Sequence, residues 1–408
     1  MRKESGKVLC LLGLAVFTGG TMAPSVRADE PVEALAIYFP GWAPTPAFEA
    51  EYGKGWDEWQ LVATPRKILP NQKLPLKLQT GVLKGTDPMD CAKEIDLAAD
   101  AGIDAFLFCW YWYGRNGELP FDESLERGFL KAPNRDRIKF ALMWCFHPIG
   151  ARPFRPPLEG GSDKMRFEPE GSPEEFLAAI DYCIAHYFKE PNYWRRDGGL
   201  YFSIYNVGDF LKRIGGREKA KAVLAAADAR VRAAGLPGLY FNGINASPSQ
   251  ADDLKDAGFR TLSHYSPPNF YGRIVKEAAE IPYDDVAAAL KETCVKFDGA
   301  ALPYVPSVPT GWDSSMRCAS DEPWPWRKSC RYPYYGIVTG NTPDKFKDLL
   351  AWAKRRVALD PKKPGVVQIC AWNEYTEGCY LVPDNHDGTG MLDAVKEIFG
   401  PHSRCQSR

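Results

Sequence analysis

Short apolar runs alternate with amphipathic stretches along most of the chain. The apolar runs are rich in aromatic and β-branched residues and are bounded by turn residues, a pattern typical of strands. The strand candidates are ALAIYF (34–39), DAFLFCW (104–110), IKFALMW (138–144), LYFSIY (200–205), LYFNGI (239–244), RTLSHY (260–265), LPYVPSV (302–308) and VVQICAW (366–372).

Helical stretches fill the intervals between these runs. In the stretch 172–188, Ser172 and Pro173 are typical of an N-cap and a first turn, and Glu175 is placed to close a capping box. Thr342 and the proline after it repeat this start. The predicted helices are 87–102, 123–132, 172–188, 217–235, 249–258, 283–299, 342–360 and 390–400.

Strands that alternate with helices in this way predict a single (β/α)8 TIM barrel. The alternative is an open, doubly wound sheet. The number of repeats favours the barrel, and so does the absence of a glycine-rich phosphate turn after the first strand. No GxGxxG motif or P-loop is present. We expect one catalytic domain over residues 29–408.

Several predicted strand-to-helix links are long: 41–86, 110–121, 145–171 and 310–341. In a barrel they all emerge on the face where such enzymes build their sites. The links carry many aromatic residues: Trp42, Trp56, Trp59, Trp110, Tyr111, Trp112, Tyr113, Trp312, Trp324 and Trp326. An aromatic rim suits the apolar faces of sugar rings, although the same residues can simply stabilise long loops.

The first residues resemble a secretory signal. A basic start at Arg2, Lys3 and Lys7 precedes a short apolar core, and Val26-Arg27-Ala28 is a small-residue cleavage pattern. We therefore predict a signal peptide over 1–28 and a secreted or periplasmic protein. A membrane anchor is the alternative. No other apolar run is long enough to span a membrane.

Charge and cysteine content exclude several classes. The 51 basic and 52 acidic residues give a net charge of -1, so neither nucleic acid nor an anionic membrane is an expected partner. Of 11 cysteines, Cys318 and Cys330 flank one loop where a disulfide can form. Cys109, Cys145 and Cys370 lie in or beside apolar strands and are expected to be buried. Because no CxxC pair exists, neither a zinc site nor a redox site is expected, and no cofactor is implied.

The end of the eighth strand carries the strongest chemical signal. In AWNEYTEGCYLVPD (371–384), Glu374 and Glu377 stand among aromatic residues. Residues three apart on a strand point to opposite faces, so both can reach one pocket only if the chain leaves extended geometry. Gly378 makes such a turn plausible. Paired carboxylates cleave glycosidic bonds, and burial with mutual repulsion pushes their pKa values apart. The alternative is an ordinary strand end with solvated acids.

These residues also carry a resemblance. WNEYTEG (372–378) resembles the WNEW-x-EG signature of the family 99-like glycoside hydrolases, which include WbsX-type proteins. Five further segments resemble family motifs in the same order, so the likeness spans most of the chain: AIYFPGW (36–42), GWDEW (55–59), AGIDAFLFCWYWYG (101–114), HYFKEPNYWRRDGGLYFSIY (186–205) and PSVPTGWDSSMR (306–317).

The resemblance implies a (β/α)8 barrel that acts on a carbohydrate. It implies that Glu374 is a base that activates the neighbouring 2-hydroxyl, giving an anhydro-sugar intermediate and net retention, and that Glu377 is the general acid. It further implies the substrate-binding residues Tyr38, Glu58, Trp110, Tyr205, Tyr265, Trp312, Asp313, Arg317, Trp372 and Asn373.

Two departures concern the substrate. WCFHPIGARP (144–153) stands where relatives read WANENWTR, which makes His147 a new candidate contact. Val382 replaces an acid of the family pattern YLEPD. Two weaker candidates leave alternatives open. His264 can meet a sugar hydroxyl or be a buried, hydrogen-bonded histidine, and DNHDG (384–388) can hold calcium or be a plain polar turn.

The leading hypothesis is an exported glycoside hydrolase that cleaves a polysaccharide or glycan. A WbsX-like glycosyltransferase is the second, but the sequence has no Asp-x-Asp motif and no nucleotide-binding pattern. A non-catalytic, carbohydrate-binding barrel is the third.

Overall fold

The computed structural model describes residues 31–150, 166–277, 279–318, 324–325, 332–360 and 363–400. The predicted signal peptide lies outside these ranges, as do Trp326 and Cys330, so cleavage and the Cys318–Cys330 disulfide stay predictions. No helix in the described ranges has the length and apolar character needed to cross a bilayer.

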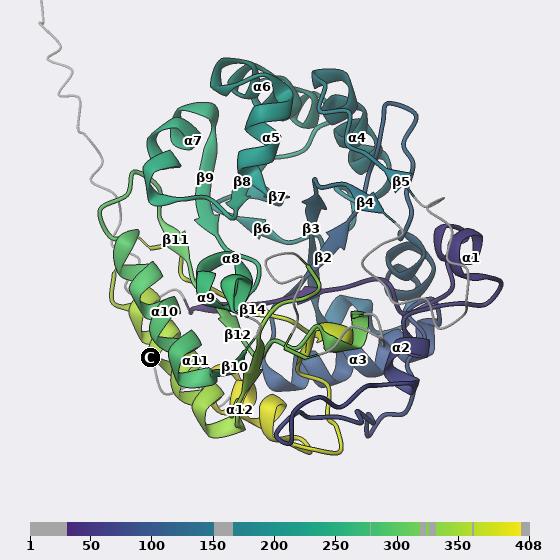
Figure 1. Cartoon of the computed structure of the whole chain (residues 1–408). Helices are drawn as coiled ribbons and strands as arrows, with labels where there is room; N and C mark the ends of the chain where they lie inside the picture. Colours follow the sequence, from purple (N-terminus) through teal and green to yellow (C-terminus); the bar gives the residue numbers. More distant parts are fainter. Residues whose placement is uncertain are drawn as a thin grey trace, which may run out of the picture.

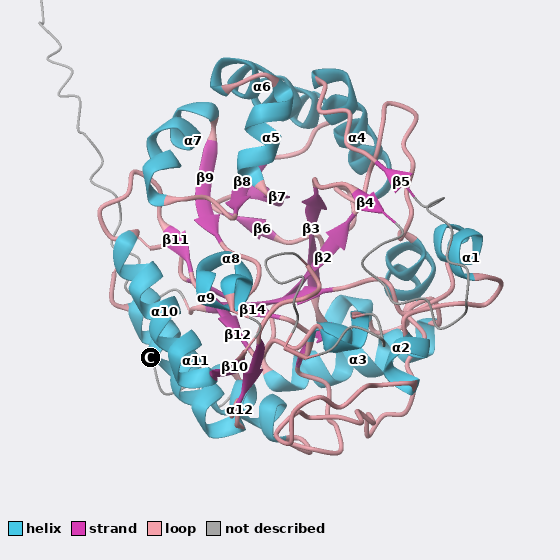
Figure 2. Ribbon diagram, in the orientation of Figure 1, coloured by secondary structure: helices cyan, strands magenta, loops and turns pink. Residues whose placement is uncertain are grey.

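All the predicted strands form, and they close into a barrel at the centre of the molecule (Figure 2). Every neighbouring pair around the barrel is parallel. The barrel strands are β1 (Glu33–Tyr38), β2 (Ala105–Trp110), β3 (Lys139–Cys145), β7 (Gly199–Tyr205), β8 (Leu239–Ile244), β9 (Phe259–Ser263), β11 (Tyr304–Val305), β12 (Ser307–Pro309) and β14 (Val366–Cys370). The prediction of a (β/α)8 TIM barrel is confirmed.

The seventh predicted strand closes the barrel in two pieces. β11 pairs with β9, and β12 pairs with β14. Between the pieces lies Pro306, whose ring removes a backbone donor. Its carbonyl still accepts a hydrogen bond from the N–H of Gln368 (2.9 Å). One short segment therefore joins both ends of the sheet.

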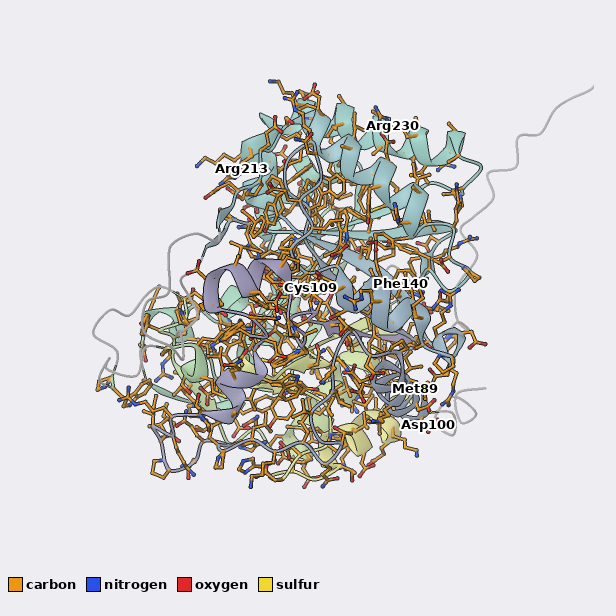
Figure 3. The ribbon with its side chains drawn as sticks, turned by 90° about the vertical axis from the view of Figure 1, so that its right-hand side faces the viewer. Met89, Asp100, Cys109, Phe140, Arg213 and Arg230 are labelled. Atoms are coloured by element: carbon orange, nitrogen blue, oxygen red, sulfur yellow. The ribbon has the colours of Figure 1, made fainter. Side chains whose placement is uncertain are left out.

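Helices form the outer layer around these strands (Figure 1). They are α3 (Pro88–Ala101), α4 (Pro173–His186), α5 (Val207–Ile214), α6 (Arg217–Ala233), α7 (Ala251–Ala257), α10 (Tyr283–Lys296), α11 (Pro343–Ala358) and α12 (Gly390–Phe399). In Figure 3, Cys109 and Phe140 lie in the middle of the molecule, whereas Arg213 and Arg230 lie on the outer helices.

The prediction of an α-helix at 123–132 is wrong, because this segment forms two shorter turns of other types. A π turn, η1 (Ser124–Gly128), is followed by a 3₁₀ turn, η2 (Phe129–Lys131). Gly128 packs so closely on the chain that a Cβ there would lie 1.9 Å from the carbonyl oxygen of Gly85. Ser124 donates to the carbonyl of Pro40 (2.6 Å), which ties the same turn to the end of β1.

Only one of the two hydrogen bonds of the predicted capping box on α4 forms. Ser172 accepts from the N–H of Glu175 (3.1 Å), as expected. The Glu175 carboxylate turns away to accept from the N–H groups of Gly114 (2.6 Å) and Gly171 (2.6 Å). It fastens the loop after β2 to the start of α4 instead of closing the box.

The long strand-to-helix links are partly folded. The link after β1 contains α1 (Pro46–Tyr52) and α2 (Trp59–Ala63), and the link after β3 contains the paired β4 (Ile149–Gly150) and β5 (Arg166–Phe167). The link after β12 contains the 3₁₀ turn η5 (Ser315–Arg317) and β13 (Ile337–Thr339), which pairs with β10 (Glu280–Pro282). The link after β9 contains α8 (Pro267–Phe270) and α9 (Gly272–Lys276).

Candidate active site

The chain turns sharply just after β14. Two short antiparallel strands, β15 (Asn373–Glu374) and β16 (Cys379–Tyr380), enclose a 3₁₀ turn, η6 (Tyr375–Glu377). Gly378 ends the turn in the left-handed region (φ 64°), and a Cβ there would lie 2.8 Å from the backbone nitrogen of Asp313. Only glycine fits this position. The turn leaves extended geometry, as the sequence analysis required, and both glutamates line one cavity.

This cavity has a volume of about 480 Å³ and lies at the carboxyl ends of the barrel strands. Its size is in the range of small-molecule sites. The residues that line it are Phe39, Cys109, Tyr111, Phe121, Met143, Cys145, His147, Pro148, Ile149, Tyr205, Asn206, Tyr265, Ser266, Pro268, Asn269, Trp312, Arg317, Tyr332, Tyr335, Glu374 and Glu377.

A single buried arginine joins the carboxylates. Arg317 ends η5 and is 4% exposed. Its Nη1 donates to Oε1 of Glu377 (2.6 Å), and its Nη2 donates to Oε2 of Glu374 (3.2 Å) and Oε2 of Glu58 (2.8 Å). Its Nε donates to the Thr376 hydroxyl (2.9 Å). Three buried carboxylates thus surround one guanidinium, which supplies the pairing that buried charges need.

Two tyrosines complete the hydrogen bonds of the pair. Tyr265 donates to Oε1 of Glu374 (2.7 Å), and Tyr332 donates to Oε1 of Glu377 (2.7 Å). Tyr332 also contacts Arg317. Both oxygens of Glu374 therefore accept hydrogen bonds. Glu377 accepts two on Oε1, whereas its buried Oε2 has no partner among the described residues.

Burial raises the pKa of both carboxyl groups. For Glu374 the pKa lies well above its usual range because burial and the charge of Glu377 outweigh Arg317, which lowers it. Burial also raises the pKa of Glu377, while Arg317 and the Tyr332 hydrogen bond lower it. Both shifts are upward, where the sequence analysis expected the two values to be pushed apart. The pair is consequently placed to hold a proton at higher pH than ordinary carboxylates.

Some of the predicted binding residues line the cavity, and the others lie outside it. Tyr205, Tyr265, Trp312 and Arg317 line the cavity, together with His147. Glu58 lies one layer behind, where its Oε2 accepts hydrogen bonds from Arg317 and from the Thr376 hydroxyl (2.5 Å).

Tyr38 and Trp372 lie on the other side of the barrel wall. Successive residues of a strand point to opposite faces, so Phe39 lines the cavity and Tyr38 faces the helices. The Tyr38 hydroxyl (2.8 Å) and the Trp372 Nε1 (2.9 Å) both donate to Glu94 of α3. Their expected place at the substrate is therefore wrong.

Trp110, Asn373 and Asp313 also lie outside the cavity lining. Trp110 stacks on Trp112 with ring centroids 5.7 Å apart, because its neighbours on β2 take the inward positions. Asn373 accepts from the N–H of Phe39 (2.7 Å) and donates to its carbonyl (3.0 Å). Asp313 accepts from Gln72 (2.9 Å). Asn373 and Asp313 fix the chain around the site, and neither reaches the space where substrate fits.

The aromatic rim is narrower than expected. Of the Trp and Tyr residues that were predicted to form the rim and that the structure describes, Tyr111 and Trp312 line the cavity. Trp42 and Trp59 pack instead on Tyr375, with ring centroids 4.6 Å and 5.1 Å away. These two tryptophans therefore pack the link after β1 against the turn η6.

Aromatic rings and thiols form the wall away from Arg317. His147 packs edge-on against Tyr205 (centroids 5.2 Å apart) and Tyr111 (6.0 Å), and burial lowers its pKa, which favours the neutral imidazole. Cys109 and Cys145 line the floor. Sequence reasoning missed Tyr332. It stands in the aromatic run RYPYYG (331–336), near the end of the link after β12, and nothing in that run singles out Tyr332 from the other tyrosines.

The weaker candidates have ordinary partners. His264 lies outside this cavity, its Nδ1 is 3.0 Å from the Tyr304 hydroxyl, and burial lowers its pKa to about 4. In DNHDG, Asp384 accepts from Tyr380 (2.5 Å), and Asp387 pairs with Lys73. No group of three His, Cys, Asp or Glu side chains within the described ranges is arranged to hold a metal ion.

Comparison with known proteins identifies the family of this chain. The family model described as "Glycosyltransferase WbsX" matches residues 34–395. This chain belongs to the WbsX family. The protein WxcX of two Xanthomonas campestris pv. campestris strains, ATCC 33913 and B100, is 25% identical over 396 residues, which cover 90% of this chain and 50% of the relative. The chain thus spans about half the length of these curated relatives.

Solved structures share the fold of this WbsX-family chain. A GH99 endo-alpha-mannosidase from Bacteroides thetaiotaomicron, in complex with bis-tris propane, is 16% identical with a TM-score of 0.56, covering 92% of this chain and 98% of that one. A glycoside hydrolase-like protein is 17% identical with a TM-score of 0.55, covering 93% and 97%. At this identity the likeness shows the barrel fold.

Proposed function

We propose that this WbsX-family chain is a glycoside hydrolase that cleaves glycosidic bonds in a polysaccharide or glycan with retention of configuration. The observation that carries the proposal is the pair of buried glutamates that share Arg317 and line one cavity. Two carboxyl groups, one protonated and one ionised, are the standard equipment for this reaction. The fold shared with an endo-alpha-mannosidase supports the same reading.

Hydrogen bonding distinguishes the two carboxyl groups. Oε1 of Glu377 already accepts from Arg317 and Tyr332, so a proton on this group belongs on Oε2, the oxygen without a protein partner. Glu377 then acts as general acid and gives that proton to the leaving glycosidic oxygen.

Glu374 suits the complementary role. Both its oxygens accept hydrogen bonds, from Tyr265 and from Arg317, and such bonds favour the ionised form, whereas burial and the charge of Glu377 raise its pKa. A proton on Glu377 removes that neighbouring charge, so the pair holds one proton with Glu374 ionised. As a base it takes the proton of the neighbouring 2-hydroxyl, whose oxygen attacks the anomeric carbon as the leaving group departs. Water then attacks the anomeric carbon of the anhydro-sugar and gives a proton to Glu377, while Glu374 returns its proton to the 2-oxygen as the C1–O2 bond breaks. Both glutamates regain their starting states, and the two inversions give net retention.

Glycosyl transfer from a nucleotide sugar is the second candidate, because the family description names it. A nucleotide-sugar diphosphate needs unengaged cationic donors. Among the described lining residues, Arg317 alone is a lysine or arginine, and its Nη1, Nη2 and Nε all donate to protein acceptors. The carboxylates around it further disfavour an anionic donor.

Export is part of the proposal and rests on residues 1–28, which have the basic start and apolar core of a signal peptide. Expression of the whole chain in a bacterial host, followed by N-terminal sequencing of the processed protein, tests it. We expect a new N-terminus at Asp29. An intact chain held in the membrane fraction indicates an anchor instead.

A panel of neutral and acidic polysaccharides tests the activity, with reducing ends measured after incubation. We expect release without any added donor, and loss of release in Glu377→Gln. Glu397→Gln, which changes an acid of α12 that contacts Lys347, is the matched control. Strict dependence on a nucleotide sugar supports the transferase. Saccharide binding without turnover by wild type, unchanged in the Glu377→Gln and Glu374→Gln variants, supports a non-catalytic barrel.

A further inference from the structure

A buried glutamine lies behind the active site in the long link after β1. Gln72 is 5% exposed, and its Oε1 accepts from the N–H groups of Ile68 and Leu69 (2.7 Å for Leu69). Its Nε2 donates to Oδ2 of Asp313 (2.9 Å) and to the Ser315 hydroxyl (3.0 Å). A side-chain amide has two donor hydrogens and two acceptor positions, so Gln72 uses its full capacity.

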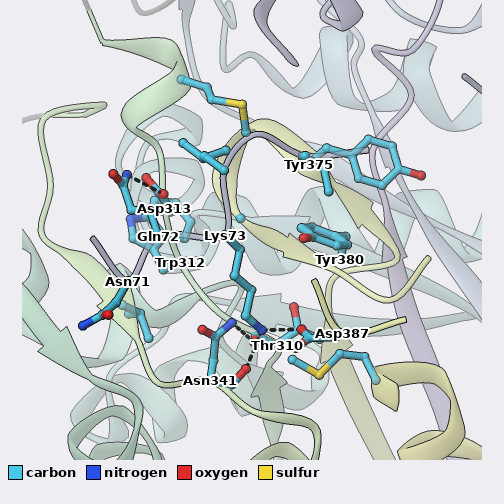
Figure 4. Close-up of a pocket in the computed structure, with 16 residues that line it drawn as sticks. Asn71, Gln72, Lys73, Thr310, Trp312, Asp313, Asn341, Tyr375, Tyr380 and Asp387 are labelled. Atoms are coloured by element: carbon cyan, nitrogen blue, oxygen red, sulfur yellow. Dashed lines mark hydrogen bonds and ion pairs between the residues drawn. The ribbon is translucent and has the colours of Figure 1, made fainter. Parts of the chain in front are cut away.

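Asp313 connects this amide to the carboxylate pair. Figure 4 shows the bond between Gln72 and Asp313 at the edge of a small cavity of about 40 Å³. The other oxygen of Asp313 accepts from the N–H of Ser315 (3.0 Å), and its own N–H donates to the carbonyl of Glu377 (2.6 Å). Ser315 begins η5, which ends at Arg317.

We propose that Gln72 is a positioning residue for the carboxylate pair, acting through Asp313 and Ser315 on the turn that carries Arg317. The inference rests on the proposed function, since it concerns how the acid and base are held. Gln72 itself does not line the active-site cavity that contains Glu374 and Glu377. Its amide fixes the start of η5, the Arg317 guanidinium at the other end binds Glu374 and Glu377, and Asp313 also fixes the backbone of Glu377.

The amide is chemically specific here. Its two donors face a carboxylate and a hydroxyl, so an apolar side chain leaves Asp313 with fewer donors in a buried place. A carboxylate at this position repels Asp313. The titratable groups that line the same small cavity are Lys73, Asp313, Tyr375, Tyr380 and Asp387. Lys73 is already paired with Asp387 and with the carbonyl of Asn341 (2.6 Å), as Figure 4 shows.

Gln72→Glu tests the role because its defect should depend on pH. At pH 8 the new carboxylate repels Asp313 and displaces η5, and we expect kcat to fall about 10- to 100-fold with KM within about threefold. At pH 5 the protonated carboxyl regains a donor hydrogen, so the defect relative to wild type should shrink to about threefold. Gln79→Glu makes the same change at an exposed position of the same link and should match wild type at both pH values.

A second measurement needs no substrate, so it separates this inference from the proposed hydrolysis. Carbodiimide with an amine nucleophile labels carboxyl groups, and mass spectrometry reports the label on Glu374 and Glu377. We expect more than about a twofold rise in Gln72→Glu at pH 8, because a displaced Arg317 leaves them open to reagent. Ser315→Ala, which removes one acceptor of the Gln72 amide, should show the same rise if Gln72→Glu does not fold. Lower thermal stability with unchanged labelling, or a loss of kcat equal at both pH values, overturns the inference.

Discussion

Carboxylates are buried on both sides of the eighth strand, and they are held in different ways. Outside the barrel, Glu94 accepts from Tyr38 and Trp372, two neutral donors, and burial raises its pKa to about 7. Inside, Glu374 and Glu377 share a guanidinium, and each also accepts a hydrogen bond from its own tyrosine hydroxyl. Trp372 and Glu374 are two residues apart, yet they serve opposite sides of the wall because the chain bends between them.

The difference in partners distinguishes a buried carboxyl group that supports the structure from a buried pair that can take part in a reaction. Burial outweighs the two neutral donors and favours protonated Glu94, and each of its oxygens already has a donor within the protein. The inner pair keeps a cation beside it and leaves Oε2 of Glu377 without a partner. An unsatisfied buried oxygen costs stability, and in the proposed reaction it serves to deliver a proton.

The largest expected effect is on activity. Glu377→Gln should lower kcat/KM by about 10²- to 10⁴-fold, because it removes the acid while keeping the size of the side chain. The loss should be smaller for an activated aryl glycoside, whose leaving group needs little protonation. Glu94→Gln, its counterpart on the outer side, should retain activity within about threefold. Equal losses in the two variants would contradict the division of roles.

Removal of the shared cation comes next. Arg317→Met leaves Glu58, Glu374 and Glu377 buried without their guanidinium, so we expect about 3–5 kcal/mol of lost unfolding free energy at pH 8. At pH 5 Glu374 and Glu377, whose pKa values burial raises, bind protons more fully, and the loss should be smaller. Urea unfolding at both pH values measures it. Arg230→Met, which breaks an exposed pair with Asp181, should change little at either pH.

Glu94 should show a pH dependence of stability. Its pKa is raised from 4.5 to about 7 in the folded protein, so the folded state binds the extra proton and the stabilisation fades as the pH rises from about 4.5 through 7. By pH 8 the charged form costs up to about 3 kcal/mol. Glu94→Gln lacks this cost, so its melting temperature relative to wild type should rise between pH 5 and pH 8. Asp348→Asn, at an exposed position on α11, should show no such trend.

The barrel was predictable because its signals are local. Each strand is a short apolar run, and α3, α4 and α11 each begin at a capping side chain followed by proline, so the order of elements could be read directly. The helix at 123–132 failed because tertiary contacts at Gly128 and Ser124 decide its form. The resemblance also placed Tyr38 and Trp372 at the substrate, although strand alternation sends Tyr38 outward and both meet Glu94.

The carboxylate pair was predictable in position but its partners were not. Glu374, Glu377 and a following glycine stand together in sequence. Tyr332 and Gln72 come from distant loops, and no local pattern tells which of many loop residues will meet Arg317 or Asp313. Such contacts depend on how the long links fold over the barrel.

The smallest expected effect concerns Tyr332, and it tests the assignment of Glu377 as the acid. The hydrogen bond from the Tyr332 hydroxyl lowers the pKa of Glu377, so Tyr332→Phe should raise that pKa. An acid must be protonated to act, so the alkaline limb of the kcat/KM profile should move to higher pH, with only a few-fold loss of kcat at its optimum. Tyr182→Phe removes a hydroxyl bonded to Glu126 (2.8 Å) in the outer layer and should leave the profile unchanged. A shift of the acid limb alone, to higher pH, would show that Glu377 acts as the base, and the roles of the two glutamates would have to be exchanged.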